Sequence, residues 1–194
     1  LEQAFKRYPC LGEAGIKTVI NGPFTFAPDG NPLVGPVPGV PGYWAACAVM
    51  AGFSQGGGVG LALAEWMVHG ETSSDVFAMD VARFGDWTTN AYTRDKVREN
   101  YQRRFSITYP NQELPVARPF QTTPAYGIWD QQNAVFGAGY GLEHVNYFAP
   151  EGEKRYETPS YRRSNAFEAV GAECRAVRNA VGINEIHNFG KYEV

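Results

Sequence analysis

The residue types in 51–60 and their spacing are typical of a catalytic or cofactor-binding segment. The run reads AGFSQGGGVG and lies between the apolar segments 43–50 and 61–69. A strand, a glycine turn and a helix in this order often bind an anion or a polarised oxygen. Backbone N–H groups at a helix start have no internal partner, and the helix dipole adds positive potential there. The pattern predicts a binding or catalytic turn that is followed by a helix over 58–69.

One interpretation places a nucleophile at Ser54. The spacing Gly52-x-Ser54-x-Gly56 matches the elbow of serine hydrolases, in which a strand and a helix expose the serine between them. Against this interpretation, no glycine-rich loop upstream completes an oxyanion hole, and residues 71–120 are polar rather than a series of buried strands. The triad partners in the required chain order are Asp130 with His144 or His187.

A second interpretation gives the chemistry to the glycines. Gly56, Gly57 and Gly58 have no side chains, so a flat cofactor such as a flavin can approach their backbone closely. The first interpretation needs an exposed, activated hydroxyl, whereas the second needs a bare stretch of backbone. The surrounding sequence has to decide between them.

Composition indicates a packed chain without a nucleic-acid or membrane partner. The 194 residues are 44% hydrophobic and 19% charged, and the net charge is −3. The paired cations at 103–104 and 162–163 are expected to be solvated surface charges. No apolar run approaches the roughly 20 residues that cross a bilayer. Leu1 is not a Met and Val194 lies in strand-like sequence, so we expect a piece of a longer polypeptide.

The three cysteines argue against both a disulfide framework and a zinc site. Cys10, Cys47 and Cys174 are widely spaced with no C-x-x-C motif, which fits a reducing compartment such as the cytoplasm. Cys47 and Cys174 lie in apolar segments and are expected in the core. Glu143 and His144 are too few for a ligand set, so no metal site is predicted.

Short strands are predicted before the glycine run and helices after it. The segment 43–50 is expected to be the most buried strand, and the helix over 58–69, apolar nearly all round, is expected to be buried on several sides. The predicted elements are strands at 16–20 and 43–50, helices at 58–69, 88–104, 124–136 and 165–181, a proline-stiffened connector at 110–119, and a strand from about Asn188.

Motifs spread along the chain resemble the dimethylglycine and sarcosine dehydrogenase family. Those similar to the end of its FAD domain are at 21–36, 43–44, 57–60 and 65–70. Those similar to its small central domain are at 80–92, 98–101 and 109–110. Those similar to its aminomethyltransferase-like, folate-binding domain are at 123–126, 161–168 and 181–192. The resemblance covers nearly the whole chain and crosses two domain junctions in the family's order.

The resemblance implies an α+β chain in three parts. Residues 1–72 would be the C-terminal part of a D-amino-acid-oxidase-like, FAD-dependent oxidoreductase domain. Residues 73–120 would be the central domain, and residues 121–194 the truncated start of the aminomethyltransferase-like domain. The implied activity is oxidation of dimethylglycine or sarcosine by hydride transfer to FAD, with the one-carbon unit passed to tetrahydrofolate. Oxygen or an electron-transfer flavoprotein would accept the electrons, and a eukaryotic protein would work in the mitochondrial matrix.

The cofactor-binding residues that the resemblance implies are Ser54, Gln55, Gly56, Gly57 and Gly58. The glycine N–H groups would face the flavin pyrimidine edge, and Ser54 and Gln55 would donate hydrogen bonds to the ring or the substrate. The resemblance assigns no catalytic residue within the chain. Where the family usually has Asp-Leu-Ser before Phe-Gly-Lys, this chain has Glu-Ile-His-Asn at 185–188. A third interpretation is that the chain by itself is an inactive scaffold.

Overall fold

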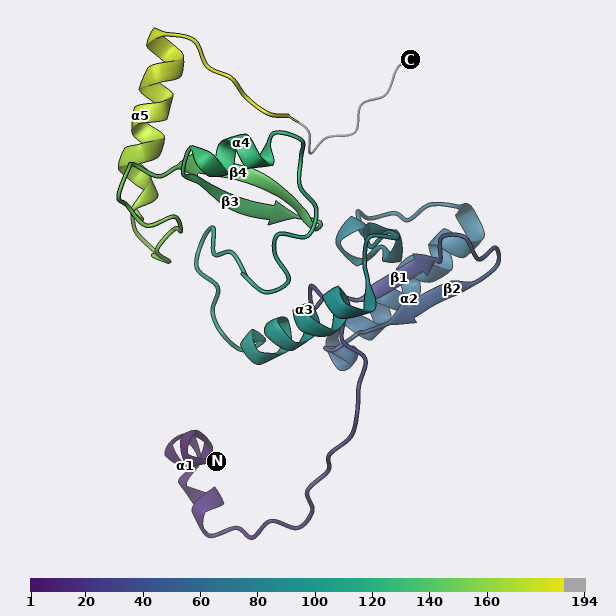
Figure 1. Cartoon of the computed structure of the whole chain (residues 1–194). Helices are drawn as coiled ribbons and strands as arrows, with labels where there is room; N and C mark the ends of the chain where they lie inside the picture. The colour runs from purple at the N-terminus through teal and green to yellow at the C-terminus, as the bar shows by residue number, and fades with distance from the viewer. Residues whose placement is uncertain (187–194) are drawn as a thin grey trace.

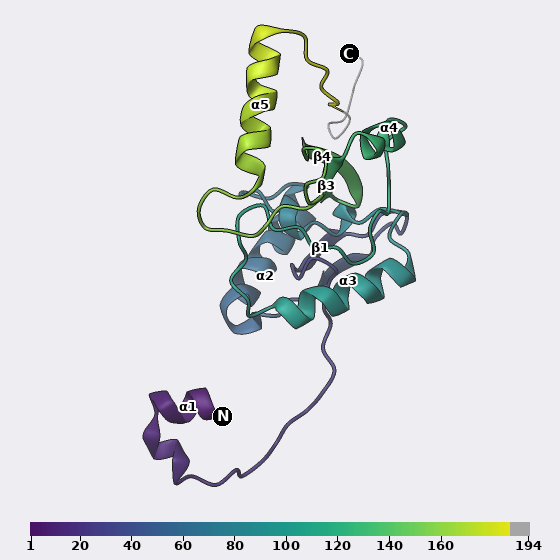
Figure 2. The same ribbon diagram turned by 60° about the vertical axis from the view of Figure 1, so that its left-hand side comes forward.

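Two antiparallel strand pairs organise the chain, and each packs against helices (Figures 1 and 2). The computed structural model describes residues 1–186. Mixed helices and small sheets confirm the α+β class. The strands are β1 (Leu33–Pro36), β2 (Trp44–Cys47), β3 (Ala134–Gly139) and β4 (Leu142–Phe148). The α-helices are α1 (Glu2–Arg7), α2 (Gly52–His69), α3 (Asn90–Arg103), α4 (Tyr126–Gln131) and α5 (Ala166–Asn179).

The β1–β2 pair is covered by α2 on one face. Val34 of β1 and Val59 of α2 are buried, and the rings of Trp44 and Trp66 meet edge to face at 6.4 Å. Gly35, at φ +114°, lets the backbone approach Trp66, since an added Cβ would lie 2.8 Å from that ring. The expectation that 43–50 is the most buried strand is wrong: β2 has only four residues, none of them fully buried, and its Cys47 is exposed.

The predicted strand at 16–20 is also wrong. These residues form no regular structure, and Ile20 is 92% exposed. A strand needs a hydrogen-bonded neighbour to be stable, and none of the strands in residues 1–186 lies beside this segment. It leads instead from α1, which lies away from both strand pairs, to the turn before β1 (Figures 1 and 2).

Arg83 ties the segment after α2 back onto the turn before β1. It ends the short 3-10 helix Val81–Arg83, and its side chain is 1% exposed. Its Nε and Nη2 donate to the two carboxylate oxygens of Asp29 at 2.8 and 2.9 Å. Asp29 also accepts the Asn31 N–H at 3.1 Å. The carboxylate therefore shapes its own turn and holds a buried cation from 54 residues away.

Replacing Asp29 with asparagine is expected to lower the free energy of local unfolding of β1, its opening free energy, by about 2 kcal/mol. The amide can keep the turn but leaves the Arg83 charge buried without a counterion. Hydrogen exchange of the β1 amides measures this change. Asp95→Asn, which breaks an exposed pair with Arg94, is the control and should change stability by less than about 0.5 kcal/mol. Equal effects of the two substitutions would contradict the argument.

The predicted helix over 88–104 is confirmed as α3. The Thr89 hydroxyl caps it by accepting the Tyr92 N–H at 3.2 Å. A buried Lys96–Glu99 pair on α3 then binds the connector: Lys96 donates to the Leu114 carbonyl at 2.9 Å, and Glu99 accepts the Val116 N–H at 3.0 Å. The connector itself has no helix or strand, as its prolines predict.

The predicted helix over 124–136 is too long, because its second half is not helical. Only α4 forms, and Asn133, at φ +61°, ends it before β3 begins. The strands β3 and β4 then form a hairpin whose two tip residues, Tyr140 and Gly141, both have positive φ, as a tight two-residue hairpin turn requires. The many glycines in 137–141 hid this hairpin from the sequence pattern.

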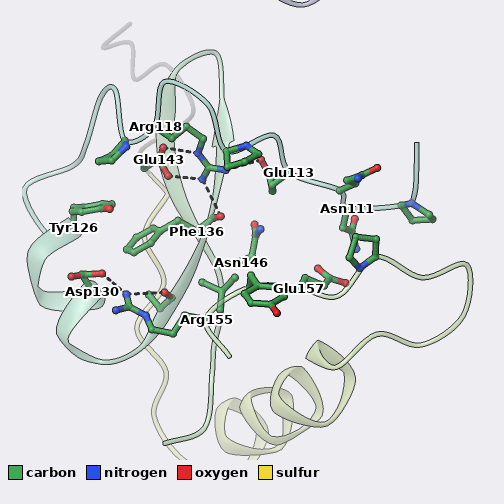
Figure 3. Close-up of a pocket in the computed structure, with 18 residues that line it drawn as sticks. Asn111, Glu113, Arg118, Tyr126, Asp130, Phe136, Glu143, Asn146, Arg155 and Glu157 are labelled. Atoms are coloured by element: carbon green, nitrogen blue, oxygen red, sulfur yellow. Dashed lines mark hydrogen bonds and ion pairs between the residues drawn. The ribbon is translucent and has the colours of Figure 1, made fainter. Parts of the chain in front are cut away.

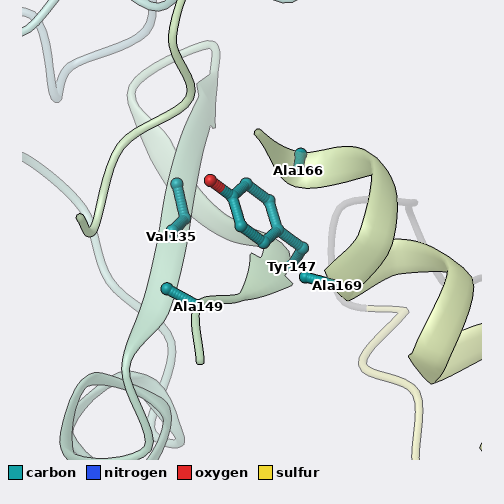
Figure 4. Packing of buried hydrophobic residues seen from close by; sticks show 5 residues of the cluster. All are labelled: Val135, Tyr147, Ala149, Ala166 and Ala169. Carbon is teal, nitrogen blue, oxygen red and sulfur yellow. The ribbon is translucent and has the colours of Figure 1, made fainter. Parts of the chain in front are cut away.

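The second core lies between this hairpin and α5 (Figure 4). Tyr147 of β4 is 2% exposed and packs on the alanines of α5. The valines of that helix lie outside this core and are exposed to solvent. The expected burial of Cys47 and Cys174 is wrong, because both are exposed. The predicted helix over 165–181 forms as α5, and its Asn165 makes no capping hydrogen bond, since its side-chain oxygen accepts the Thr158 N–H instead. No helix in residues 1–186 is long and apolar enough to cross a membrane.

Candidate functional site

The glycine run lies inside α2 rather than in a turn before it. The helix begins at Gly52, six residues earlier than predicted, and ends at His69 as predicted, where Gly70 forms a left-handed cap. Gly56, Gly57 and Gly58 are therefore in the second turn, where helix geometry commits their N–H groups to carbonyls four residues earlier. The turn that connects β2 to the helix is 48–51.

The backbone N–H groups that have no acceptor within α2 lie at the start of this helix. The N–H groups of Ser54 and Gln55 both bond to the Ala51 carbonyl, at 2.9 and 2.8 Å. The preceding groups of Gly52 and Phe53 have no acceptor within the helix, because the first N–H groups of any helix precede its hydrogen-bonding pattern. The dipole of the 18-residue helix adds positive potential at this end.

Arg104 adds a second source of positive charge beside the start of α2. With Met50 and Ala51 it lines a hollow of about 330 Å³, and with Ala48 and Met50 a neighbouring hollow of about 370 Å³. Within residues 1–186 its guanidinium makes no ion pair and stacks 4.5 Å from the Phe105 ring.

Sequence reasoning treated the arginine pair at 103–104 as solvated charge and missed this placement. The fold brings Arg104 to 48–51 from across the chain, and no local pattern shows that. The Asp29 carboxylate also lines the hollow of about 330 Å³ beside Ala51, but it is already paired with Arg83. The positive charge of Arg104 is thus the uncompensated one at this end of α2.

The glycines of α2 leave an open backbone surface. A Cβ added at any of the glycines of this helix would meet nothing within 4 Å: Gly52, Gly56, Gly57, Gly58 and Gly60. Neighbouring apolar side chains are also exposed, including Phe53 and Leu61. The expectation that this helix is buried on several sides is wrong within the described chain, where only Val59 is buried. The β1–β2 pair covers one face alone.

The residues proposed for a serine triad are not brought together. The Ser54 hydroxyl donates to the Ala51 carbonyl of its own helix at 3.0 Å. Asp130 forms an ion pair with Arg155, and His187 lies outside the described residues. Glu143 and His144 are adjacent in β4, so their side chains point to opposite faces of the hairpin. Residues 1–186 contain no group of three His, Cys, Asp or Glu side chains that could hold a metal.

Two family models match the chain in sequence. The FAD dependent oxidoreductase central domain matches residues 69–123, and the GCVT N-terminal domain matches residues 125–194. The second match begins directly after the first, in the order that the sequence motifs predicted. These models leave the glycine run of α2 outside their limits.

Several characterised proteins are similar over almost the whole chain. Mitochondrial dimethylglycine dehydrogenase of Mus musculus is 38% identical over 194 residues, covering 100% of this chain and 22% of the relative. Mitochondrial sarcosine dehydrogenase of Homo sapiens is 30% identical over 219 residues, covering 99% and 24%. The 4-methylaminobutanoate oxidase (formaldehyde-forming) of Paenarthrobacter nicotinovorans is 31% identical over 192 residues, covering 96% and 23%.

The chain thus spans between a fifth and a quarter of the length of these relatives. The similarity is not confined to a motif, since it runs through the strand pair before α2, the central segment and the start of the GCVT domain. The chain thus combines matches to the FAD dependent oxidoreductase central domain and the GCVT N-terminal domain with similarity over nearly its whole length to dimethylglycine and sarcosine dehydrogenases.

Proposed function

We propose that the protein is an FAD-dependent oxidoreductase that removes a methyl group from an N-methylglycine-type amine, dimethylglycine or sarcosine. The relatives are named as dehydrogenases or oxidases of methylated amines, and the matching central domain is that of FAD dependent oxidoreductases. In this proposal residues 1–72 end the FAD domain, 73–120 are the central domain and 121–194 begin the aminomethyltransferase-like domain. The segment 51–60 faces the flavin.

The open glycine surface of α2 carries this proposal. Each glycine in a helix costs about 1 kcal/mol relative to alanine, and nothing within residues 1–186 occupies the space that a methyl group would take. Five glycines at 52–60 therefore make the helix less stable without any packing benefit inside this chain. A flat group that approaches the backbone from outside the chain accounts for them.

The residues around this surface fit a flavin. FAD, when bound, would supply the acceptor for the hydride of the N-methyl group. The N–H groups of Gly52 and Phe53, the dipole of α2 and the Arg104 charge provide positive potential where negative charge arrives. Ser54 and Gln55 lie exposed on the same first turn. The Gln55 amide can donate a hydrogen bond to the ring or substrate, and the Ser54 hydroxyl can do so by turning away from the Ala51 carbonyl.

The GCVT N-terminal match supports a second step, in which the one-carbon unit passes to tetrahydrofolate. The partners that we propose are a small methylated amine and an electron acceptor, which is either oxygen or an electron-transfer flavoprotein. The mouse and human relatives are named as mitochondrial, so a eukaryotic protein of this kind is proposed for the matrix.

The proposal is tested by flavin content and by reduction of the flavin with dimethylglycine or sarcosine. The full-length protein is expected to retain FAD and to lose its yellow colour anaerobically when either amine is added. Ser54→Ala should slow this reaction but not abolish it, since it removes one hydrogen bond and no nucleophile, and a fluorophosphonate should leave Ser54 unlabelled. A colourless protein labelled at Ser54 would favour the hydrolase instead.

Gly57→Ala should weaken FAD binding by at least about tenfold, because its methyl group fills the surface that the flavin approaches. The same substitution should stabilise the flavin-free helix by about 1 kcal/mol. Gly127→Ala is the matched control, since it also lies in a helix, α4, with equally open space but outside the proposed contact. Equal losses of FAD in both variants would exclude the proposed contact surface.

A further inference from the structure

A separate cavity lies between the connector 110–119 and the β3–β4 hairpin (Figure 3). Its volume is about 690 Å³, within the range of small-molecule sites. The loop 155–159 closes a further side. None of the residues 51–60 lines it, so this cavity is distinct from the flavin surface proposed above and does not depend on it.

Both arginines of this cavity are already bound to carboxylates. Arg118 donates to the two oxygens of Glu143 at 2.8 and 2.6 Å, and to the Phe136 carbonyl at 2.9 Å. Its Nη1 lies 3.2 Å from Glu113. Arg155 pairs with Asp130 across the cavity wall (Figure 3). An anionic ligand would have to displace these carboxylates.

Negative charge is in excess around the cavity. Four carboxylates line it against the two guanidinium groups, and Glu157 has no cationic partner among the described residues: its Oε1 accepts only the Ser164 hydroxyl at 2.6 Å. Burial raises the pKa of the Tyr126 hydroxyl, and the charges of Glu143 and Asp130 raise it further.

Apart from the amides of Asn111, Gln112 and Asn146, the remaining walls are largely apolar. Tyr126 stacks on Phe136 at 4.3 Å between ring centres, and prolines of the connector lie opposite. Aromatic faces attract cations that carry alkyl groups, because the ring quadrupole is negative on its face. Apolar walls with an uncompensated carboxylate select a ligand with a positive charge inside an apolar shell.

We propose that this cavity binds a small organic cation, an ammonium ion that carries methyl or other short alkyl groups. The alkyl groups contact the aromatic and proline walls, and the charge lies toward Glu157 and Glu113. This assigns a ligand site to the junction between the connector and the start of the GCVT domain.

Choline and its neutral isostere 3,3-dimethylbutan-1-ol provide a direct test, because they differ in charge and hardly in shape. Calorimetric titration of the full-length protein is expected to show choline binding at least about tenfold more tightly than the alcohol. Equal binding of the two, or no choline binding, overturns the proposal. The anion 3,3-dimethylbutyrate should not bind, and tight binding of it would contradict the charge argument.

Variants of Glu157 locate the bound cation. Glu157→Gln should weaken choline binding about fivefold and Glu157→Lys about twenty-five-fold, since each step removes one unit of attraction across a few ångströms of partly solvated space. Glu153→Gln and Glu153→Lys are controls for net charge, because Glu153 is exposed and does not line the cavity. Parallel losses at Glu153 and Glu157 would mean that the cation binds elsewhere and would overturn the assignment.

Discussion

Replacing Arg118 with methionine is expected to lower the opening free energy of the β3–β4 hairpin by about 3–5 kcal/mol. The Glu143 side chain is 3% exposed and would keep its charge with no counterion. The substitution also removes the hydrogen bond that Arg118 donates to the Phe136 carbonyl at 2.9 Å. A buried charge without a partner costs much more than the pair itself contributes, so this is the largest effect expected of a single side chain.

A double variant separates these causes. Arg118→Met combined with Glu143→Leu removes both charges, and should recover most of the loss because no unpaired ion remains. Hydrogen exchange of the amides in β3 and β4 gives the opening free energy in the full-length protein. Arg94→Met, in an exposed pair with Asp95, is the control and should change stability by less than about 0.5 kcal/mol. If the two single losses simply add in the double variant, the pair does not act as a unit.

Local signals in the sequence predicted the elements that depend on local contacts. The helix predicted at 88–104 is α3, and the predicted end of α2 at residue 69 is correct. Thr89 and Gly70 form the caps there, and a cap depends only on residues a few positions apart. The start of α2 was missed because glycine is a poor helix former, so the run suggested a turn. Packing of Val59 and Trp66 on the β1–β2 pair favours the helix in spite of that propensity.

Contacts between distant segments were not predictable in the same way. The ion pairs of Arg83 with Asp29 and of Arg118 with Glu143 join residues 54 and 25 positions apart. Nothing in the local sequence selects one carboxylate among many as the partner. The same applies to Arg104, whose place beside α2 follows from the path of α3 and not from its neighbours in the chain.

The candidate flavin site combines both kinds of information. The residue types at 54–58 were visible as a pattern, and the family resemblance chose between serine and glycine chemistry. The structure changes which donors are free: they belong to Gly52 and Phe53 at the helix start, because Gly56, Gly57 and Gly58 are one turn further along. What remains for those three glycines is their open surface.

The tip of the β3–β4 hairpin docks on an aromatic cluster of the central segment, and its glycine makes this possible. Trp87 contacts Tyr92 and Phe120 with ring centres 5.0 and 5.7 Å apart. Gly141 lies against the Trp87 ring, and a Cβ added there would be 2.5 Å from a ring carbon. Its φ of +80° is also one that other residues adopt with strain.

Gly141→Ala should therefore lower the opening free energy of the hairpin by about 3 kcal/mol, from the left-handed backbone and from the overlap with Trp87. Gly152→Ala has nearly the same φ, +82°, but open space around the added methyl group, and should cost only about 1 kcal/mol. Gly139→Ala has neither constraint and should be nearly neutral. Hydrogen exchange at β3 and β4 measures the Gly139 and Gly141 variants, and exchange of the amides around residue 152 measures Gly152→Ala. If Gly141→Ala costs no more than Gly152→Ala, the close packing of the hairpin tip on Trp87 does not stabilise the junction.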